Sequence, residues 1–336
     1  MTSGTDVFET GDGIRRDRSM EEAVKAIFVA IVAFAAAFLL LKVRFSFLPV
    51  DGGKTAVRPD GTRVDVNAAS KGKTTGVGVV FTIIWYAASL IFYGVSKEML
   101  LYLGALLAMT LSGFLDDRSA IPWKDYIKAI IDAVIVAAVV AVFLLFHDPD
   151  VYFLNWHFRV PVALYAVLAF VLLWVSVNVT NCSDGVDGLC GGVTSVELLA
   201  FVLIFSEISR EYKGMAAILI GVLIAYLFYN WFPSTLLMGD GGSRPIGLFL
   251  GLLAMLSRHP FAFLLLSFVF IFDGGIGLGK VFLKRYLKIV ILEKIRFPFH
   301  DELRKNRGWP VQNVSLFAIG MEIVFAGIMA ILYFAV

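Results

Sequence analysis

Ten apolar runs divide this 336-residue chain, and few folds other than a membrane-spanning bundle accommodate them. A helix needs about 20 predominantly apolar residues to cross a bilayer. The run at 245–257 is short, and the run at 260–279 contains Asp273-Gly-Gly, a sequence that can break a helix. The ten runs cover residues 24–43, 76–94, 99–115, 127–146, 160–178, 190–207, 214–231, 245–257, 260–279 and 314–335.

The composition agrees with a membrane protein. Apolar residues make up 59% and charged residues 17% of the chain, whereas soluble domains average about 45–50% and about 25%. We therefore predict an all-α polytopic membrane protein with about ten transmembrane helices and a small cytoplasmic β-hairpin. Residues 1–23 would form a polar N-terminal tail, and residues 24–336 a single integral-membrane domain. No convincing cleavage site follows the run at 24–43, so we expect an uncleaved first span.

The distribution of positive charge predicts the orientation in the membrane. An even number of spans places both termini on one side, and the odd-numbered loops on the other. Of the 29 Lys and Arg residues, 20 fall in the odd-numbered loops and 9 on the opposite side. Lys and Arg favour cytoplasmic loops, so the odd-numbered loops should be cytoplasmic and both termini outside. The cluster Arg15, Arg16 and Arg18 argues the other way but is outweighed.

Two of these inner loops carry local structural signals. Residues 54–66 alternate around Pro59-Asp-Gly, a pattern typical of a β-hairpin. The segment Val281–Leu292 has mixed apolar and basic faces, so it either extends the ninth span or lies in the membrane interface.

The central inner loop, residues 178–192, is the most polar segment between two apolar runs. It reads Asn-Val-Thr-Asn-Cys-Ser-Asp-Gly-Val-Asp-Gly-Leu-Cys-Gly-Gly. Charges are costly at membrane depth, so such a loop is expected to line a polar cavity or meet water. Asp184 and Asp187 are three residues apart and share a face if the segment is helical. Cys182 and Cys190 do not form a disulfide framework and are expected to be small apolar fillers.

Three further inner loops add charged groups. Asp116 and Asp117 stand side by side at the end of a span, where like charges repel unless a cation or proton neutralises one of them. Asp240 stands among glycines, which let backbone amides approach a phosphate closely. The segment 297–309 brings His300 together with two acids and three cations.

Each of these features has a plain structural alternative. The aspartate pair could be a solvated helix flank, Asp240 could belong to a simple turn, and His300 could be structural. Asp273 lies inside a span, where it is either functional or a hydrogen-bonded helix break. Four acidic loops on one face favour a shared site. Oxygen ligands without thiolates or a histidine cluster suit Mg²⁺, which together with Lys and Arg is typical of phosphoryl transfer.

Three motifs resemble those of the polyprenyl-phosphate N-acetylhexosamine-1-phosphate transferases. Residues 178–189 resemble the family's Asn-x-x-Asn-x-x-Asp-Gly-x-Asp-Gly-Leu, and residues 238–243 resemble its Met-Gly-Asp-x-Gly-Ser. Residues 113–117, Gly-Phe-Leu-Asp-Asp, resemble its aspartate pair. The resemblance covers nearly all of the chain after the polar tail. Within the family, the resemblance is strongest to the MraY-type branch, the phospho-N-acetylmuramoyl-pentapeptide transferases.

The resemblance implies a bacterial inner-membrane homodimer with ten spans and a cytoplasmic active site. It implies transfer of phospho-MurNAc-pentapeptide from UDP-MurNAc-pentapeptide to undecaprenyl phosphate with Mg²⁺, forming lipid I and UMP, and no nucleic-acid partner. Asp240 matches the metal-ligand position, and Asp116 and Asp117 match a pair near the metal and the lipid phosphate, where one of them acts as a base or orients the acceptor. The positions matched to the nucleotide site are Asn181, Asp184 and Asp187, with Asn178 and Asn230 beside them, and either Lys71 or Lys73.

Three departures separate this chain from the family pattern. The MraY-type branch carries Pro-x-His-His-His before Gly-Trp, whereas Pro298-Phe-His-Asp-Glu302 keeps only His300, which would face the donor sugar-peptide. A lysine that often follows the aspartate pair is Ala120 here, so Arg118 or Lys124 would supply that charge. The aromatic residue that commonly precedes Met-Gly-Asp is Leu237.

Several alternatives stay open from sequence. The reaction is either one in-line displacement or two steps through an aspartyl phosphate on Asp240 or Asp117. The donor could instead be UDP-GlcNAc, as in enzymes that begin O-antigen or teichoic acid linkage units. From a different class, the chain could be an ion or solute transporter that uses Asp273 at mid-membrane.

Overall fold

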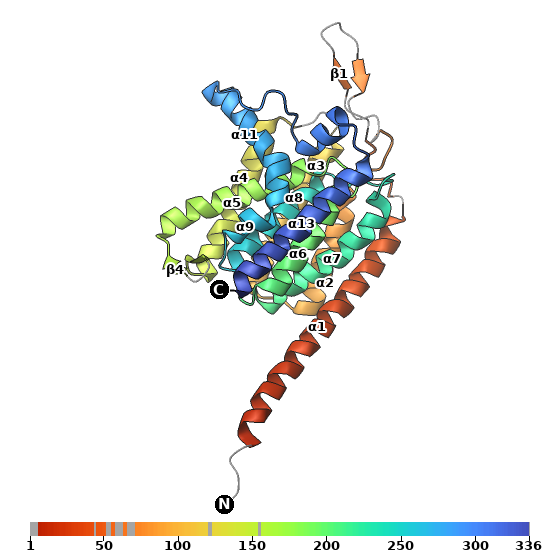
Figure 1. The fold of residues 1–336 in the computed structure, drawn as a ribbon. Coiled ribbons are helices and arrows are strands. Elements are labelled where there is room, and N and C mark those ends of the chain that lie inside the picture. The colour runs from red at the N-terminus through yellow and green to blue at the C-terminus, as the bar shows by residue number, and fades with distance from the viewer. Residues whose placement is uncertain are drawn as a thin grey trace, which may run out of the picture.

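The computed structural model describes residues 6–43, 45–51, 55–57, 63–65, 71–119, 123–153 and 156–335, which form a mostly helical bundle (Figure 1). The long helices are α1 (Asp6–Leu41), α2 (Gly78–Tyr93), α3 (Lys97–Arg118), α4 (Asp125–Phe146), α5 (Val162–Cys182), α6 (Leu189–Ile204), α7 (Arg210–Asn230), α8 (Asp240–Leu256) and α13 (Val311–Phe334).

Apolar composition explains why these segments are helices that span a membrane. Six of the described helices are long and apolar enough to cross a bilayer, namely α3, α4, α5, α7, α13 and the Met20–Leu41 part of α1. Two shorter apolar helices, α2 and α6, stand among them. All ten predicted runs fall on helical segments, which confirms a polytopic, mostly α-helical membrane protein. Helix α1 begins at Asp6, so the segment expected as a polar tail contains helix that continues into the first span.

Helix α8 occupies the centre of the bundle, and every residue from Gly241 to Leu256 is buried. It packs against α2, α3, α5 and α6. Glycines allow the closest approaches: a side chain at Gly78 would collide with the backbone of Gly242, and one at Gly113 with the backbone of Asp240. The N-terminus of α8 is therefore wedged between α2 and α3, and the site described below is built around that point.

The ninth predicted span is an irregular helical run. It comprises α9 (Ala262–Leu266), α10 (Phe268–Phe270), the π-helical turn η1 (Ile271–Gly275), α11 (Ile276–Phe282) and the second π-helical turn η2 (Leu283–Leu287). The predicted break at Asp273-Gly-Gly is thus a widened π-helical turn, a feature frequent at functional sites. The segment from Val281 extends this run to Leu287, as one of the two sequence alternatives expected.

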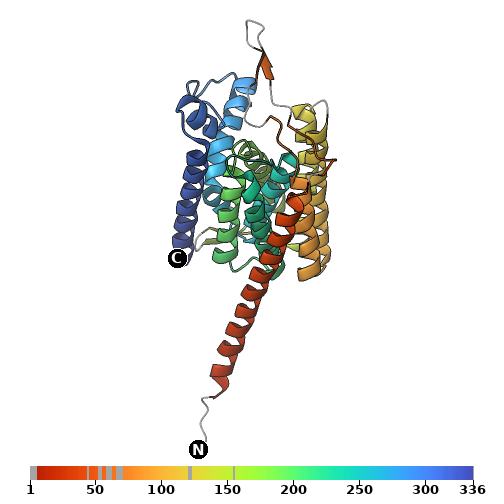
Figure 2. The same ribbon diagram turned by 90° about the vertical axis from the view of Figure 1, so that its right-hand side faces the viewer.

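Two hairpins cap opposite ends of the bundle. Strand β1 (Thr55–Val57) pairs antiparallel with β2 (Arg63–Asp65), which confirms the predicted hairpin, although its turn at Pro59-Asp-Gly lies outside the described residues. Strand β3 (Asp150–Phe153) pairs with β4 (Trp156–Arg159), a hairpin that the sequence analysis did not anticipate. The first residues of α1 and the last residues of α13 both lie toward the end of the molecule opposite β1 (Figures 1 and 2).

Candidate functional site

A polar cavity of about 460 Å³ lies where the loops after α5 and α7 meet the N-terminus of α8. Six of the residues singled out in the sequence line it: Lys73, Asn181, Asp184, Asp187, Asn230 and Asp240. The segments that carry them are far apart along the chain and are brought together by the packing of α5, α6, α7 and α8. The fold therefore assembles residues from four separate segments in one polar cavity.

Asp187 and Lys73 form one wall of this cavity. The Lys73 Nζ lies 3.4 Å from Asp187 Oδ2 and donates to Ser234 Oγ at 2.7 Å. The Ser234 backbone N–H donates to the same Asp187 oxygen at 3.0 Å. The loop after α7 is therefore tied both to the central loop and to the strand-like segment before α2. Of the two lysines proposed from the sequence, Lys73 lines the cavity and Lys71 does not.

Asp184 and Asn230 fix the loops at the base of the cavity. The Gly239 backbone N–H donates to Asp184 Oδ2 at 3.1 Å. Asn230 accepts from the Gly188 N–H at 2.8 Å and donates to the Leu236 carbonyl at 2.9 Å, so its side-chain amide holds the two loops together. Desolvation, together with the charges of Asp117 and Asp240, raises the pKa of Asp184 well above its ordinary value. The ionised form of this carboxyl group is therefore unfavourable unless a proton or a cation compensates its charge.

Asp240 is the first residue of α8 and projects from its N-terminus. Asp117, at the end of α3, accepts from the Gly241 N–H at 3.3 Å. Gly239 has φ of 69°, in the left-handed region, and a side chain there would collide with the Asp117 carboxylate. Glycine at this position therefore allows Asp117 and Asp240 to lie against the same turn.

Lys128 of α4 is a residue that the sequence analysis missed. Its Nζ forms an ion pair with Asp116 Oδ2 and lies 3.9 Å from Asp240 Oδ2. Asp116 also accepts from the Trp123 N–H at 2.8 Å. The expectation that Arg118 or Lys124 supplies the cation beside the aspartate pair was wrong. Both are exposed, whereas Lys128, at the first full turn of α4, reaches the carboxylates.

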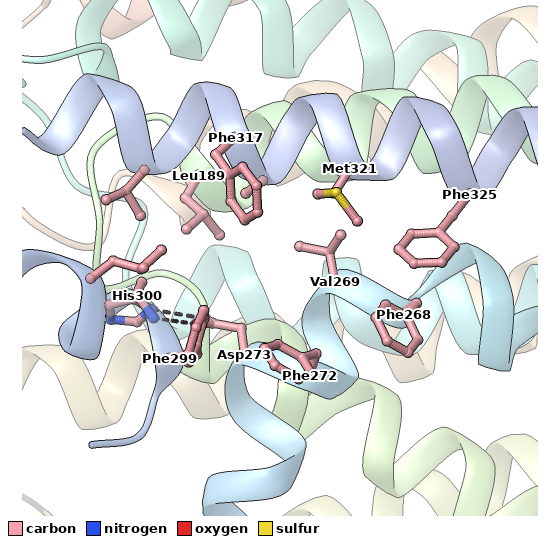
Figure 3. Close-up of a pocket in the computed structure, with 13 residues that line it drawn as sticks. Leu189, Phe268, Val269, Phe272, Asp273, Phe299, His300, Phe317, Met321 and Phe325 are labelled. Carbon is pink, nitrogen blue, oxygen red and sulfur yellow. Dashed lines mark hydrogen bonds and ion pairs between the residues drawn. The ribbon is translucent and has the colours of Figure 1, made fainter. Parts of the chain in front are cut away.

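His300 does not line the polar cavity but closes one end of a second, apolar cavity of about 320 Å³ (Figure 3). Its backbone N–H donates to Asp273 Oδ1 at 2.7 Å, and its Nδ1 lies 2.8 Å from Asp273 Oδ2. Ser183 Oγ donates to Asp273 Oδ2 at 2.9 Å. A side chain at Gly185 would approach His300 Nε2 to 2.9 Å, so this nitrogen faces the loop that carries Asp184.

The other residues named in the sequence analysis divide between the polar cavity and the surrounding helices. Asn178 donates to the Trp174 carbonyl within its own helix and does not line the cavity. Leu237, which replaces the family's aromatic residue, does line it. So does Phe232, whose ring is 40% exposed and is the aromatic side chain among the described lining residues. Cys182 and Cys190 are both free, in agreement with the expected absence of a disulfide between them.

The charge balance of the site favours a bound cation. Five carboxylates gather around it, whereas three cations of the described residues contact them: the acids are Asp116, Asp117, Asp184, Asp187 and Asp240, and the cations are Lys73, Lys128 and Arg244. Among the described residues, no three acidic, histidine or cysteine side chains converge closely enough to hold a metal ion by themselves. Oxygen donors and an incomplete protein shell fit Mg²⁺, which keeps several waters and takes further ligands from substrate phosphates.

Comparison with known proteins identifies related sequences. A sequence profile of glycosyl transferase family 4 matches residues 99–258, which run from α3 to just past α8. The chain is 34% identical to the phospho-N-acetylmuramoyl-pentapeptide-transferase of Treponema pallidum (strain Nichols), over 92% of this chain and 90% of the relative. It is similar to the enzymes of the same name from Campylobacter lari, at 27% identity over 89% and 92%, and Dictyoglomus turgidum, at 26% over 84% and 90%.

Proposed function

The chain belongs to glycosyl transferase family 4, the polyprenyl-phosphate N-acetylhexosamine-1-phosphate transferases, and on that basis we propose its specific reaction. It transfers phospho-MurNAc-pentapeptide from UDP-MurNAc-pentapeptide to undecaprenyl phosphate, which forms lipid I and releases UMP for peptidoglycan synthesis. The observation that carries this proposal is that Lys73, the Asp184–Asp187 loop and Asp240 line the same polar cavity. The similarity to enzymes of that name along nearly the whole chain supports the choice of donor.

The nucleotide end of the donor fits the wall formed by Lys73, Asp187 and Phe232. Lys73 is a cation for a phosphate oxygen, and the Asp187 carboxylate accepts from polar groups of the nucleoside. The half-exposed Phe232 ring offers a face on which uracil can stack, an interaction worth about 1–3 kcal/mol per base. Ser234, two residues further on, is tied to Asp187 and keeps this loop in place.

The chemical step is one in-line displacement. An oxygen of the undecaprenyl phosphate attacks the β-phosphorus of the donor, and the bond from that phosphorus to the bridging oxygen of UMP breaks. Asp116 and Asp117 lie beside Asp240 and orient the acceptor. Lys128, which contacts Asp116 and approaches Asp240, places positive charge where the two phosphates would otherwise repel one another.

Asp240 would hold Mg²⁺, with Asp117 and Asp184 next to it. When bound, the ion neutralises charge on the pyrophosphate and stabilises the leaving UMP. His300 faces the loop of Gly185, and Arg304 donates to the Gly185 carbonyl at 3.3 Å, so both side chains stand on the side proposed for the donor sugar-peptide. Asp273, the basis of the transporter alternative, is hydrogen-bonded to His300 and Ser183, and family membership sets that alternative aside.

The proposal includes a setting for the reaction. The protein would lie in the bacterial inner membrane as a homodimer, with the polar cavity on the cytoplasmic side and both termini outside. The excess of Lys and Arg in the odd-numbered loops supports this orientation. The cavity is formed by residues of those same loops.

UMP release by the purified protein with Mg²⁺ and undecaprenyl phosphate tests the proposal directly. Release with UDP-MurNAc-pentapeptide and not with UDP-GlcNAc is the expected result. Release with UDP-GlcNAc alone would assign the protein to the alternative donor, and release with neither would overturn the proposed reaction. Asp240→Ala should abolish turnover without unfolding the protein, whereas Asp148→Ala, an exposed aspartate far from the cavity, should not change it. Near-normal activity of the Asp240 variant would contradict the metal assignment.

A further inference from the structure

A buried arginine stands directly behind the carboxylate proposed to hold the metal. Arg244 lies one helical turn after Asp240 in α8, and its Nε is 3.4 Å from Asp240 Oδ2. Arg244 is only 3% exposed, in a helix whose remaining residues are apolar or small. Lys128 also approaches Asp240 at Oδ2. Both cations that contact Asp240 among the described residues therefore do so at one oxygen, and Oδ1 is left for a ligand.

Arg244 is held from the other side by α4. The Asp132 Oδ1 lies 3.6 Å from Arg244 Nη1, and Asp132 is only 2% exposed. Asp132 is one turn after Lys128, so a single face of α4 presents a cation to Asp116 and an anion to Arg244. The result is a chain of contacts from Asp132 through Arg244 to Asp240.

If these buried charges had only a structural role, their desolvation would cost free energy of folding. Removing two charges from water costs several kcal/mol per ion, and well-packed apolar residues often hold two helices together at least as well. The Arg244 Nη1 and Asp132 Oδ1 have no hydrogen-bond partner within the described part of the chain, so their pairing does not fully compensate that cost. The favourable contact that remains is the one from Arg244 Nε to Asp240.

We propose that Arg244 is a positioning residue that fixes the rotamer of Asp240, and that Asp132 holds Arg244 in place for this purpose. This inference rests on the proposed metal-dependent transfer. A carboxylate that lines a cavity at the start of a helix has several rotamers, and a guanidinium anchored on one oxygen selects one of them. The free oxygen then points consistently toward the cavity that Asp240 lines.

The test uses a double variant, Arg244→Leu with Asp132→Leu, which removes both charges so that neither is left buried alone. Mn²⁺ binding to the purified protein without substrates is measured by electron paramagnetic resonance, alongside kcat and the donor KM. The expected result is at least tenfold weaker Mn²⁺ binding and a tenfold lower kcat, with an unchanged donor KM and an unchanged or higher Tm. Arg244→Lys should recover part of the loss, because a lysine retains the charge without the fixed guanidinium geometry.

The control is the exposed ion pair between Arg210 and Glu22, replaced by Gln at both positions, which should leave all four quantities unchanged. Unchanged Mn²⁺ binding and kcat in the Arg244/Asp132 variant would show that the pair is only structural and would overturn the inference. Tighter Mn²⁺ binding in that variant would overturn it as well. If the unmodified protein itself binds no Mn²⁺ and releases no UMP, the proposed function fails first, and the two failures are thereby distinguished.

Discussion

His300 is held by both oxygens of Asp273, through its backbone N–H to Oδ1 and its ring Nδ1 to Oδ2. The two residues are 27 positions apart, and Asp273 lies within the π-helical turn η1. The Asp273 carboxylate at Nδ1 fixes the orientation of the ring. Its Nε2 lies 4.0 Å from Asp301 Oδ1. The Nε2 atom also faces Gly185, beside the proposed donor site.

Asp273→Asn should lower kcat by about ten- to a hundredfold, because an amide no longer requires the proton to reside on Nδ1 of His300. His300→Ala should lose at least as much activity. The double variant should be no worse than His300→Ala alone, since the two residues act as a unit. UMP release under saturating donor measures all three variants.

His147→Ala is the matched control, because this histidine pairs with Glu98 near the opposite end of α3. It should retain normal kcat. Additive losses in the Asp273/His300 double variant would contradict the idea that Asp273 acts through His300.

Lys128→Met should reduce kcat/KM by about a hundredfold or more, since it removes the cation that contacts Asp116 and approaches Asp240. Lys124→Met removes an exposed lysine four residues earlier and should have little effect. The initial rate of UMP release at low substrate concentrations reports this ratio. Equal losses in the two variants would indicate a general effect of charge on this face, not a specific role for Lys128.

Asp184→Asn should stabilise the protein above neutral pH while it abolishes transfer. The folded-state pKa of Asp184 is raised above its unfolded value, so the folded protein binds the proton more tightly. The stability that protonated Asp184 contributes is fully present at pH values below its pKa in the unfolded state. It is lost as the pH rises through its pKa in the folded state. The variant lacks that loss, and its free energy of unfolding should exceed that of the parent by about 1–3 kcal/mol at pH 8.

Thermal unfolding between pH 4 and pH 8 in a mild detergent measures this difference. The advantage of Asp184→Asn should shrink toward pH 4, where the parent carboxyl group is itself neutral. Added Mg²⁺ should raise the Tm of the parent more than that of the variant. A difference in Tm that is constant with pH would exclude titration of Asp184 as its cause.

Phe232→Leu should raise the donor KM by about 5- to 100-fold with a smaller change in kcat, because stacking contributes to binding of the base more than to the chemical step. Phe232→Tyr keeps the ring and should behave like the parent. An exposed phenylalanine outside the cavity, Phe228→Leu, is the control. If all three variants have the parental KM, uracil does not stack at this position.

The helices and the acidic loops could be predicted from the sequence because both signals are local. Each apolar run is a contiguous segment, and hydrophobicity alone explains why it forms a helix in a membrane. The aspartates at 116, 117, 184, 187 and 240 stand out because charged residues are rare beside such runs. Their shared position at one end of the bundle follows from counting spans.

The partners of those aspartates could not be predicted in the same way. Lys128, Asp132 and Arg244 act across the contact between α4 and the N-terminus of α8, and no spacing along the chain encodes that distance. The sequence shows that Lys128 and Asp132 are one helical turn apart and so share a face of α4. It does not show which helix packs against that face. The β3–β4 hairpin escaped notice because the sequence between its strands, Leu154-Asn155, contains no glycine and is not a typical hairpin turn pair.

The burial of α8 has a consequence for how the membrane acts on this protein. Thinning or thickening of a bilayer exerts force on helices whose side chains touch lipid, and it changes their tilt. From Gly241 to Leu256, α8 presents no exposed side chain on which lipid could act, and its first turn is locked against α2 and α3. A change in bilayer thickness is therefore expected to alter the tilt of the outer helices α1, α4, α5 and α13 and to leave the position of Asp240 unchanged.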